Sequence, residues 1–348
     1  MQDRYSRQIR FAPLGRKGQE RLQASQVAIV GCGALGTASA DMLARAGVGC
    51  LRIIDRDFVE ASNLQRQTLF TESDARQRLP KAQAARKALT QVNSDIEVDA
   101  LCDDLDYRNI ASLVEGCHLL IDGTDNFETR FLLNDWSVSQ GVPWIYGAAL
   151  GSYGVAAAID VGQPGDTTPC LRCLMEELPA AGSVETCETA GILGPTVQAV
   201  ASFQASQALR RLAGHDFVPV MLRVDVWEGY WRSSDYLALK NPDCPCCAGE
   251  EFPYLGGEAG DRSARLCGRN AVQIRPSRLN SGEGPLPVDF DLLLQRLPED
   301  IEVQRNPFLM RLRLDGHEIH LFPDGRAIIT GTDDVATARS LYARYVGS

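Results

Sequence analysis

The sequence predicts an α/β protein with a Rossmann-like, doubly wound sheet, followed by a small α+β unit. Two apolar runs, residues 27–30 and 51–54, suit buried strands, and a G-x-G-x-x-G turn lies between them at 31–36. The turn leads into a predicted helix over 37–46, and the second run ends in Asp55. This order of strand, glycine turn, helix, strand and acid is typical of a nucleotide-binding βαβ unit.

The chemistry of this unit explains its residue types. Gly31, Gly33 and Gly36 let backbone N–H groups approach a phosphate, and the start of the helix favours an anion. Asp55 can accept hydrogen bonds from ribose hydroxyls. A tight turn that packs the strand on the helix without a ligand is the alternative interpretation of the same motif.

Positive and amide groups follow the βαβ unit. Residues 62–67 contain three amide side chains and one guanidinium, and Lys81 begins a predicted helix over 81–91. A cation at that position opposes the helix dipole unless an anion shares the site. A dinucleotide does not need so much positive charge, whereas a triphosphate with a pyrophosphate leaving group does. The pattern therefore argues against a nicotinamide dehydrogenase.

Composition sets the broad class. The chain has 348 residues, of which 45% are hydrophobic and 23% charged, and its net charge of −10 disfavours broad, nonspecific nucleic-acid binding. Residues 136–159 lack Asp, Glu, Lys and Arg, but their glycines and proline predict buried strands broken by turns rather than a membrane span. The polar N-terminus shows no secretory signal, and eleven cysteines then indicate a reducing, cytoplasmic setting with metal binding or thiol chemistry.

Further along the chain, a predicted buried strand over 118–122 ends in a polar cluster at 123–126. Ligands bind at the carboxyl edge of doubly wound sheets, so Asp125 is a candidate to hold Mg²⁺ or position a reacting phosphate. A turn-forming Asp-Asn pair is the alternative. Arg130 follows on the next helix and faces either this crevice or solvent. The remaining predicted elements are a locally basic N-terminal arm over 1–25, strands over 96–100, 142–146, 155–161 and 221–226, and helices over 107–114 and 194–212.

Four cysteines form two C-x-x-C pairs, Cys170 with Cys173 and Cys244 with Cys247. Paired thiolates in a chain without a disulfide context predict a closed, structural zinc site that joins two distant segments. Unligated cysteines and a redox pair are the alternatives. The spacing excludes Cys246 from the ligand set.

Together these motifs resemble the ThiF/MoeB family, which is related to the adenylation domains of ubiquitin-activating enzymes. The likeness covers residues 4–249, and it rests on the motifs at 4–9, 31–36, 55–57, 62–67, Lys81, 124–126, 187–191 and the two cysteine pairs. This family uses ATP to adenylate the C-terminal glycine carboxylate of a small ubiquitin-like protein, with release of pyrophosphate.

The resemblance implies a role for each matching position. The implied nucleotide-binding residues are Gly31, Gly33, Ala34, Gly36, Asp55, Asp57, Asn63, Arg66, Gln67, Lys81, Asp125 and Asn126. The implied catalytic residues are Arg7, Arg66, Lys81, Asp125 and Cys187. Arg66 and Lys81 would neutralise the β- and γ-phosphates, and Arg7 would reach into a partner subunit's site. Cys187 matches a position that takes an acyl group or a sulfur linkage in parts of the family, although an incidental loop cysteine is the alternative.

The same resemblance implies ATP, Mg²⁺ and Zn²⁺ as cofactors and a homodimer as the active form. The expected partner is a small ubiquitin-like or sulfur-carrier protein ending in Gly-Gly, with an acceptor or sulfur-donor enzyme as a further partner. Neither a membrane nor a nucleic acid is expected. The alternatives are adenylation of another carboxylate, on a tRNA nucleoside or a peptide, and a nucleotide-binding scaffold without catalysis.

The domain boundaries follow from composition. Residues 1–249 are expected to form the adenylation domain, and the glycine-rich residues 250–264 a linker. Residues 265–348 then predict a small α+β domain, with strands over 271–274, 308–314, 317–322 and 327–329 and helices over 289–297 and 334–346. This departs from family members with a rhodanese domain, because Cys267 lies near the start of the unit. A recognition module and a stabilising appendage are its two interpretations.

Overall fold

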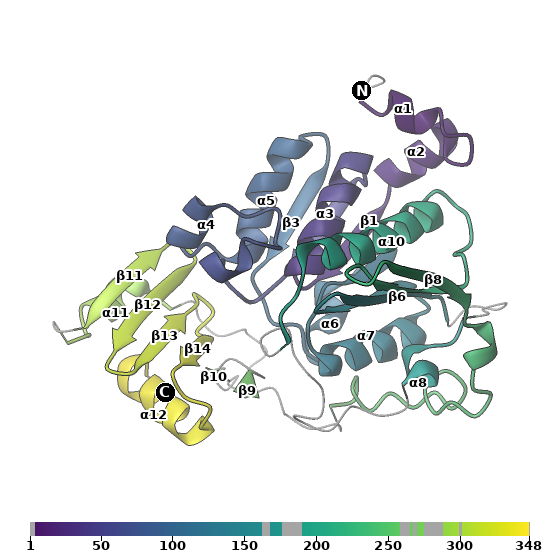
Figure 1. Ribbon diagram of the computed structural model, residues 1–348. Helices are drawn as coiled ribbons and strands as arrows, with labels where there is room; N and C mark the ends of the chain where they lie inside the picture. Colours follow the sequence, from purple (N-terminus) through teal and green to yellow (C-terminus); the bar gives the residue numbers. More distant parts are fainter. Residues whose placement is uncertain are drawn as a thin grey trace. The chain divides into compact units, whose positions relative to one another are not determined.

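A computed structural model describes residues 4–161, 168–175, 190–257, 265–266, 270–274, 288–298 and 301–347 (Figure 1). The chain divides into two units, Met1–Ala259 and Gly260–Ser348. Each unit has its own sheet and its own hydrophobic core. None of the described helices is both long and apolar enough to cross a membrane.

The first unit is built on an eight-stranded sheet in the order β3-β2-β1-β4-β5-β6-β7-β8. Its parallel strands are β1 (Gln26–Val30), β2 (Cys50–Ile54), β3 (Glu97–Leu101), β4 (Leu119–Asp122) and β5 (Trp144–Leu150). The antiparallel strands that follow are β6 (Tyr153–Ile159), β7 (Val220–Asp225) and β8 (Tyr230–Asp235). The predicted Rossmann-like sheet with antiparallel later strands is confirmed.

Helices cover both faces of this sheet because its central strands are apolar on both sides. Val27 and Ile29 of β1 pack into the core beneath α3 (Ala34–Ala46), α5 (Lys81–Val92) and α10 (Gly194–Leu212). Ala28 and Val30 point to the opposite face and pack with α6 (Ile110–Leu113) and α7 (Phe127–Gln140). Alternate residues of one strand therefore serve two cores. The remaining short helices are α1 (Ser6–Ile9), α2 (Gly15–Gln23), η1 (Ala61–Asn63), α4 (Glu72–Arg76), α8 (Leu171–Leu174) and η2 (Leu237–Leu239).

Two differences from the sequence prediction have clear physical causes. α3 begins at Ala34 rather than at residue 37, because Gly33 is already its N-cap. The helix therefore starts inside the glycine motif. β8 was not predicted, since most of its residues are exposed and no apolar run marks it. Pairing with β7 makes this segment a strand.

The second unit is a six-stranded antiparallel sheet in the order β11-β12-β13-β14-β10-β9. Its strands are β9 (Arg265–Leu266), β10 (Ala271–Ile274), β11 (Glu302–Asn306), β12 (Leu309–Leu314), β13 (His317–Leu321) and β14 (Ala327–Thr330). Side chains of the sheet form a core with α11 (Phe290–Leu294) and α12 (Val335–Tyr345). The predicted meander is present, and the unpredicted β11 extends it at a largely exposed edge.

Candidate nucleotide site and cysteine cluster

The glycine turn between β1 and α3 requires its glycines. Gly31 has a φ of +87°, which favours glycine, and a Cβ on Gly36 would lie 1.9 Å from the carbonyl oxygen of Gly31. Gly33 is the N-cap of α3, and no side chain caps the helix there. The start of a 13-residue helix is therefore left without a side-chain cap at the turn, as a phosphate site needs.

The turn after β4 packs directly on the glycine turn. A Cβ on Gly31 would lie 2.7 Å from the carbonyl carbon of Gly123, and a Cβ on Gly123 would lie 2.2 Å from the carbonyl oxygen of Gly31. Only glycines allow the two backbones to approach so closely. Gly123 and the backbone nitrogen of Thr124, at the start of the predicted polar cluster, thus lie beside the glycine turn.

A chain of acidic and basic groups connects β2 to α5. The Asp55 carboxylate accepts from the backbone N–H of Cys32 at 2.6 Å and of Asp57 at 2.7 Å. The Asp57 carboxylate in turn lies 3.1 Å from Nζ of Lys81, which is only 4% exposed. Burial raises the pKa of Asp55, and the positive charge of Lys81 opposes that rise. The structure therefore holds a buried ammonium group close to the glycine turn.

Residues of the amide-rich motif line the same region. Gln67 is 4% exposed, and its Nε2 lies 4.0 Å from the position that a Cβ on Gly33 would take. Among the described residues, Oε1 of Gln67 has no hydrogen-bond partner. Such an orphaned buried acceptor beside the turn fits a ligand that supplies a donor. Asn63 is also buried and accepts from the N–H of Glu60, and the half-buried Arg66 donates to the carbonyl of Ser62.

The polar cluster after β4 separates into different roles. Asp125 is exposed, so its carboxylate is accessible to a ligand. Asn126 is the N-cap of α7, where its Oδ1 accepts from the N–H of Thr129 at 2.7 Å. Asn126 therefore has a structural role in the helix, whatever its contact with a nucleotide.

Sequence reasoning left the position of Arg130 open and missed its partner Asp122. Both side chains are buried, and Nε of Arg130 donates to Oδ2 of Asp122 at 2.9 Å. Burial acts to lower the pKa of Arg130, but the Asp122 carboxylate raises it overall. Gln204 was missed as well. Its Nε2 donates to the carbonyls of Asp122 and Ile145. The sequence signal for Asp122 was an acid at the end of an apolar strand, and the signal for Gln204 was a glutamine on an apolar helix face.

Two predicted catalytic residues are not among the groups that the described structure places at this site. Arg7 is an exposed residue of α1. Cys187 lies outside the described residues. α10, which follows the Cys187 segment, begins beside the amide-rich motif, since a Cβ on Gly194 would lie 3.2 Å from the carbonyl oxygen of Gln65.

The two C-x-x-C pairs come together in space. The Sγ atoms of Cys170, Cys173, Cys244 and Cys247 all lie within 4.8 Å of one another. The separations from Cys170 to Cys244 and from Cys173 to Cys247 are 3.6 and 3.5 Å. Four thiolates about 2.3 Å from a tetrahedral zinc would be about 3.8 Å apart, so the cluster has the right donors and size for this metal.

Cys246 lies outside this cluster, as its spacing predicts. Its Sγ accepts from Nδ2 of Asn134 at 3.2 Å, while Oδ1 of Asn134 accepts from the N–H of Leu171 at 2.7 Å. Asp135 accepts from the N–H of Tyr254 at 3.0 Å. Asn134 thus fastens both cysteine segments to α7, and its neighbour Asp135 holds the chain at Tyr254.

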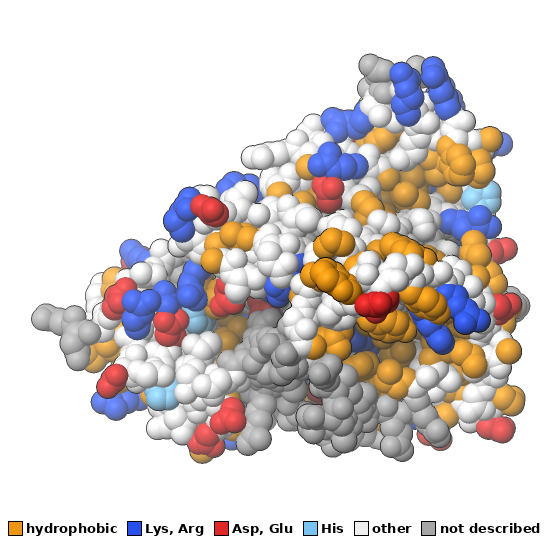
Figure 2. Space-filling view, viewed as in Figure 1, with side chains coloured by type: hydrophobic (Ala, Val, Ile, Leu, Met, Phe, Trp, Pro, Cys, Tyr) orange, Lys and Arg blue, Asp and Glu red, His pale blue; other side chains and the backbone are white. Residues whose placement is uncertain are grey.

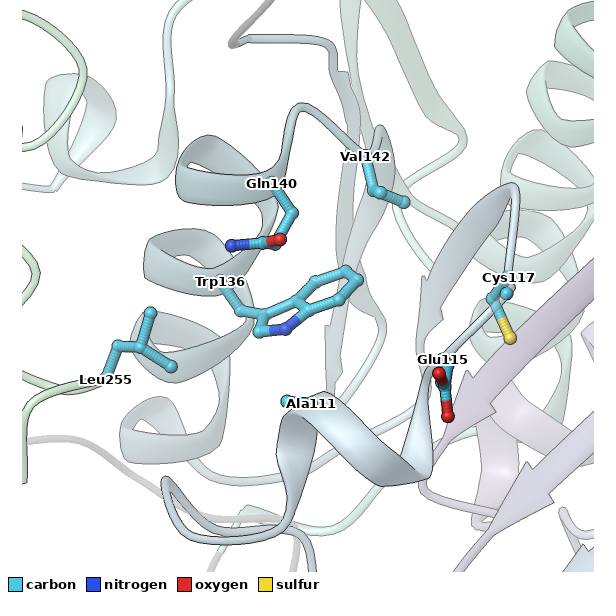
Figure 3. Close-up of a pocket in the computed structure, with 8 residues that line it drawn as sticks. Ala111, Glu115, Cys117, Trp136, Gln140, Val142 and Leu255 are labelled. Carbon is cyan, nitrogen blue, oxygen red and sulfur yellow. The ribbon is translucent and has the colours of Figure 1, made fainter.

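A pocket of about 490 Å³ lies away from these groups (Figure 3). Trp136 and Gln140 of α7 face Ala111 across it, and Glu115 and Cys117 lie on its far side. Cys117 precedes β4, whereas Gly123 follows it. The pocket is therefore at the amino end of the strand, and the glycine turn is at the carboxyl end, where ligands bind in this class of fold.

Comparisons with known proteins agree with this arrangement. The model of the ThiF family matches residues 5–246. The chain is 44% identical to the sulfur carrier protein ThiS adenylyltransferase of Bacillus subtilis (strain 168) over 348 residues, 100% of both proteins. It is 37% identical to the molybdopterin-synthase adenylyltransferase of Escherichia coli (strain K12) over 245 residues, which are 70% of this chain and 95% of that protein.

A crystal structure of E. coli MccB with ATP has the same fold as the first unit. It superposes with a TM-score of 0.61 at 21% identity and covers 71% of this chain and 75% of that chain. The glycine turn, the acidic and basic groups beside it and the family match lead to one assignment. The chain belongs to the ThiF family.

Proposed function

We propose that this protein uses ATP to adenylate the C-terminal carboxylate of a small sulfur-carrier or ubiquitin-like protein, with release of pyrophosphate. The observation that carries the proposal is the connected set of Cys32, Asp55, Asp57 and Lys81. It holds a buried cation close to a glycine turn that suits phosphate. The Bacillus subtilis relative is named as an adenylyltransferase of a sulfur carrier protein and the E. coli relative as a molybdopterin-synthase adenylyltransferase, which supports the same reaction.

The chemistry follows from charge. A carboxylate that attacks an α-phosphate brings two anions together, so cations must reduce their repulsion and stabilise the leaving group. Lys81 and Arg66 would neutralise the departing β- and γ-phosphates, while Asp55 accepts from ribose and Gln67 accepts a donor of the nucleotide. Asp125 would hold Mg²⁺, which supplies further positive charge at the phosphates. Adenylation needs no side-chain nucleophile, because the carboxylate itself attacks.

A nicotinamide dehydrogenase would not need this charge. The Lys81 side chain is 5% exposed and lies against Asp57, so the fold bears the desolvation cost of an ion pair beside the turn. Dinucleotide recognition requires the glycine turn and an acid such as Asp55, but no buried lysine. The lysine therefore favours a triphosphate substrate.

A protein substrate is supported by the surface near β8. This strand ends the sheet order, and Trp227, Tyr230 and Trp231 are 77%, 43% and 60% exposed. Figure 2 shows hydrophobic side chains gathered over α10 and β8. Exposed aromatic residues on an edge strand and on the turn before it suit contact with another protein more than contact with water.

Zinc would be held by Cys170, Cys173, Cys244 and Cys247. With four protein ligands the site is closed, so we propose that the metal has a structural role. When bound it would join residues 170–173 to residues 244–247, while Asn134 holds both segments on α7.

The remaining roles extend the same proposal. Arg7 would act in the site of a second protomer, which makes the active form a homodimer. Figure 2 shows Lys and Arg side chains on the N-terminal helices that carry this residue. Cys187 would take the acyl group from the carrier adenylate as a thioester, with release of AMP, or would form a sulfur linkage with persulfide sulfur from a sulfur-donor enzyme. Residues 265–348 would form a separate recognition domain after a linker over 250–264.

The test is ATP–pyrophosphate exchange with a recombinant ThiS-type carrier ending in Gly-Gly. We expect exchange that depends on the carrier, together with a carrier–AMP adduct in mass spectrometry. The matched control is the same carrier without its last glycine, which should give neither signal. Equal exchange with both carriers, or ATP binding without exchange, would refute the proposal.

A further inference from the structure

The buried pair of Asp122 and Arg130 controls the turn that carries Asp125. Oδ1 of Asp122 accepts from both the backbone N–H and the hydroxyl of Thr124, at 2.9 and 2.7 Å. Nη2 of Arg130 donates to the carbonyl oxygen of Thr124 at 2.8 Å. The residue before Asp125 is therefore held through its N–H, its hydroxyl and its carbonyl.

The other side of Asp125 is held as well. Asn126 caps α7 through the N–H of Thr129, so the backbone that follows Asp125 is fixed by the start of a 14-residue helix. An exposed carboxylate is thus attached to a backbone that is hydrogen-bonded on both sides. Rigid support of this kind determines how accurately a side chain meets a ligand.

The pair is itself fixed to the sheet. Nη2 of Arg130 also donates to the carbonyl of Gly147 on β5 at 3.0 Å, and its guanidinium lies 5.2 Å from the ring centre of Phe127 and 5.3 Å from that of Tyr146. Gln204 of α10 donates to the carbonyl of Asp122. Elements from both faces of the sheet therefore hold the turn.

The contacts of Arg130 hold the turn and the sheet. The residue is 5% exposed, and its guanidinium already donates to a carboxylate and two carbonyls. Three hydrogen bonds of Arg130 therefore act on Asp122, Thr124 and Gly147.

We propose that Asp122 and Arg130 are positioning residues that orient Asp125 toward the metal–ATP complex by fixing Thr124. The inference rests on the proposed function for the identity of the ligand. It adds a set of residues, Asp122, Thr124 and Arg130, that shape the site without touching the substrate.

The direct test uses Thr124→Val, which removes the hydroxyl bond but leaves the ion pair in place. We expect kcat for pyrophosphate exchange to fall about 10-fold at saturating ATP and Mg²⁺, since a small displacement of a reacting group costs rate. Ser137→Ala is the matched control, because it removes one side-chain bond to a backbone carbonyl at the other end of α7. It should lower thermal stability comparably and leave kcat unchanged.

A double-variant cycle shows whether Thr124 acts through Asp125. If it does, Thr124→Val should add no further loss to Asp125→Asn, whereas independent effects would multiply. Multiplying effects, or equal losses of kcat in Thr124→Val and Ser137→Ala, would overturn the inference. Arg130→Lys, which keeps the charge but not all of the donors, should lower kcat less than Thr124→Val does.

A readout without the carrier separates this inference from the proposed function. Mn²⁺ affinity in the presence of ATP, followed by electron paramagnetic resonance, should weaken about 10-fold in Thr124→Val and remain unchanged in Ser137→Ala. Unchanged Mn²⁺ affinity in Thr124→Val would overturn the positioning role. If wild-type protein shows no carrier-dependent exchange, the proposed function fails, and the Mn²⁺ measurement still decides this inference.

Discussion

Replacement of Lys81 by methionine isolates the charge of the buried lysine. Nζ of Lys81 lies 3.1 Å from Oδ2 of Asp57, and the two side chains are 5% and 14% exposed. Lys81→Met preserves most of the apolar stem and removes the ammonium group. The carboxylate of Asp57 then remains largely buried without this counter-charge, and the nearby Asp55 loses the group that opposes the rise of its pKa.

The expected cost follows from the geometry. With an effective dielectric constant of about 20, two unit charges 3.1 Å apart attract by about 5 kcal/mol. Removal of one partner of a buried pair typically destabilises a protein by about 3–5 kcal/mol. Lys81→Met should therefore lower Tm by roughly 10 °C in a domain of this size. A loss of exchange activity in this variant alone would not separate catalysis from folding.

The double variant Asp57→Asn/Lys81→Met makes that separation. The amide removes the charge that Lys81 balances, so we expect it to recover at least half of the lost stability in chemical unfolding. Pyrophosphate exchange should remain at least about 100-fold below wild type, because the charge that stabilises the leaving group is still absent. Recovery of exchange along with stability would show that Lys81 only holds the fold, and the assignment of its catalytic role would be wrong.

Three other predictions follow from the same structure. Arg66→Ala should abolish pyrophosphate exchange while Cys187→Ala retains it, measured in the presence of the carrier; equal loss in both would contradict their separate roles. Cys173→Ala should lose about one zinc per chain by elemental analysis and unfold at lower temperature, whereas Cys246→Ala should keep its zinc; metal loss in both would place Cys246 among the ligands. Burial raises the pKa of Asp55, and an exposed carboxylate titrates at about 4. As the pH is lowered, ATP affinity measured by calorimetry should therefore begin to fall at a higher pH than it would if an exposed carboxylate held the ligand. The raised pKa means that the folded state binds this proton more readily than the unfolded state, so protonation of Asp55 should not lower Tm over the same pH range. Asp55→Asn should bind ATP weakly, with an affinity that does not change with pH over this range.

The first half of the sheet was predictable because local signals and tertiary structure agree there. Residues 27–30 lie in β1 (Gln26–Val30), and Asp55 follows β2 at the carboxyl edge, as the alternation of apolar runs and turns predicts. The cysteine cluster was predictable for another reason, since C-x-x-C spacing is set by metal geometry rather than by the surrounding fold. These signals are carried by a few adjacent residues.

The remaining features depend on contacts between distant segments. β8 is exposed along most of its length, so only its pairing with β7 reveals it. Asp122 and Arg130 are eight residues apart, and nothing in that spacing shows that both are buried or that they share Thr124. Gln204 reaches the same turn from α10, far along the sequence. Such a network is visible only once the layers of the fold are assembled.

The site as a whole shows why the glycine motif alone cannot identify the reaction. Gly31 and Gly36 allow two backbone segments to approach closely, and this turn would be the same for any ligand that binds there. The distinction between hydride transfer and nucleotidyl transfer comes from groups that the motif does not contain. Lys81 is buried against Asp57, and the turn before Asp125 is held by an internal ion pair. We attribute the desolvation cost of two ion pairs beside one glycine turn to a bound anion that changes its charge distribution during the reaction, and pyrophosphate release is such a change.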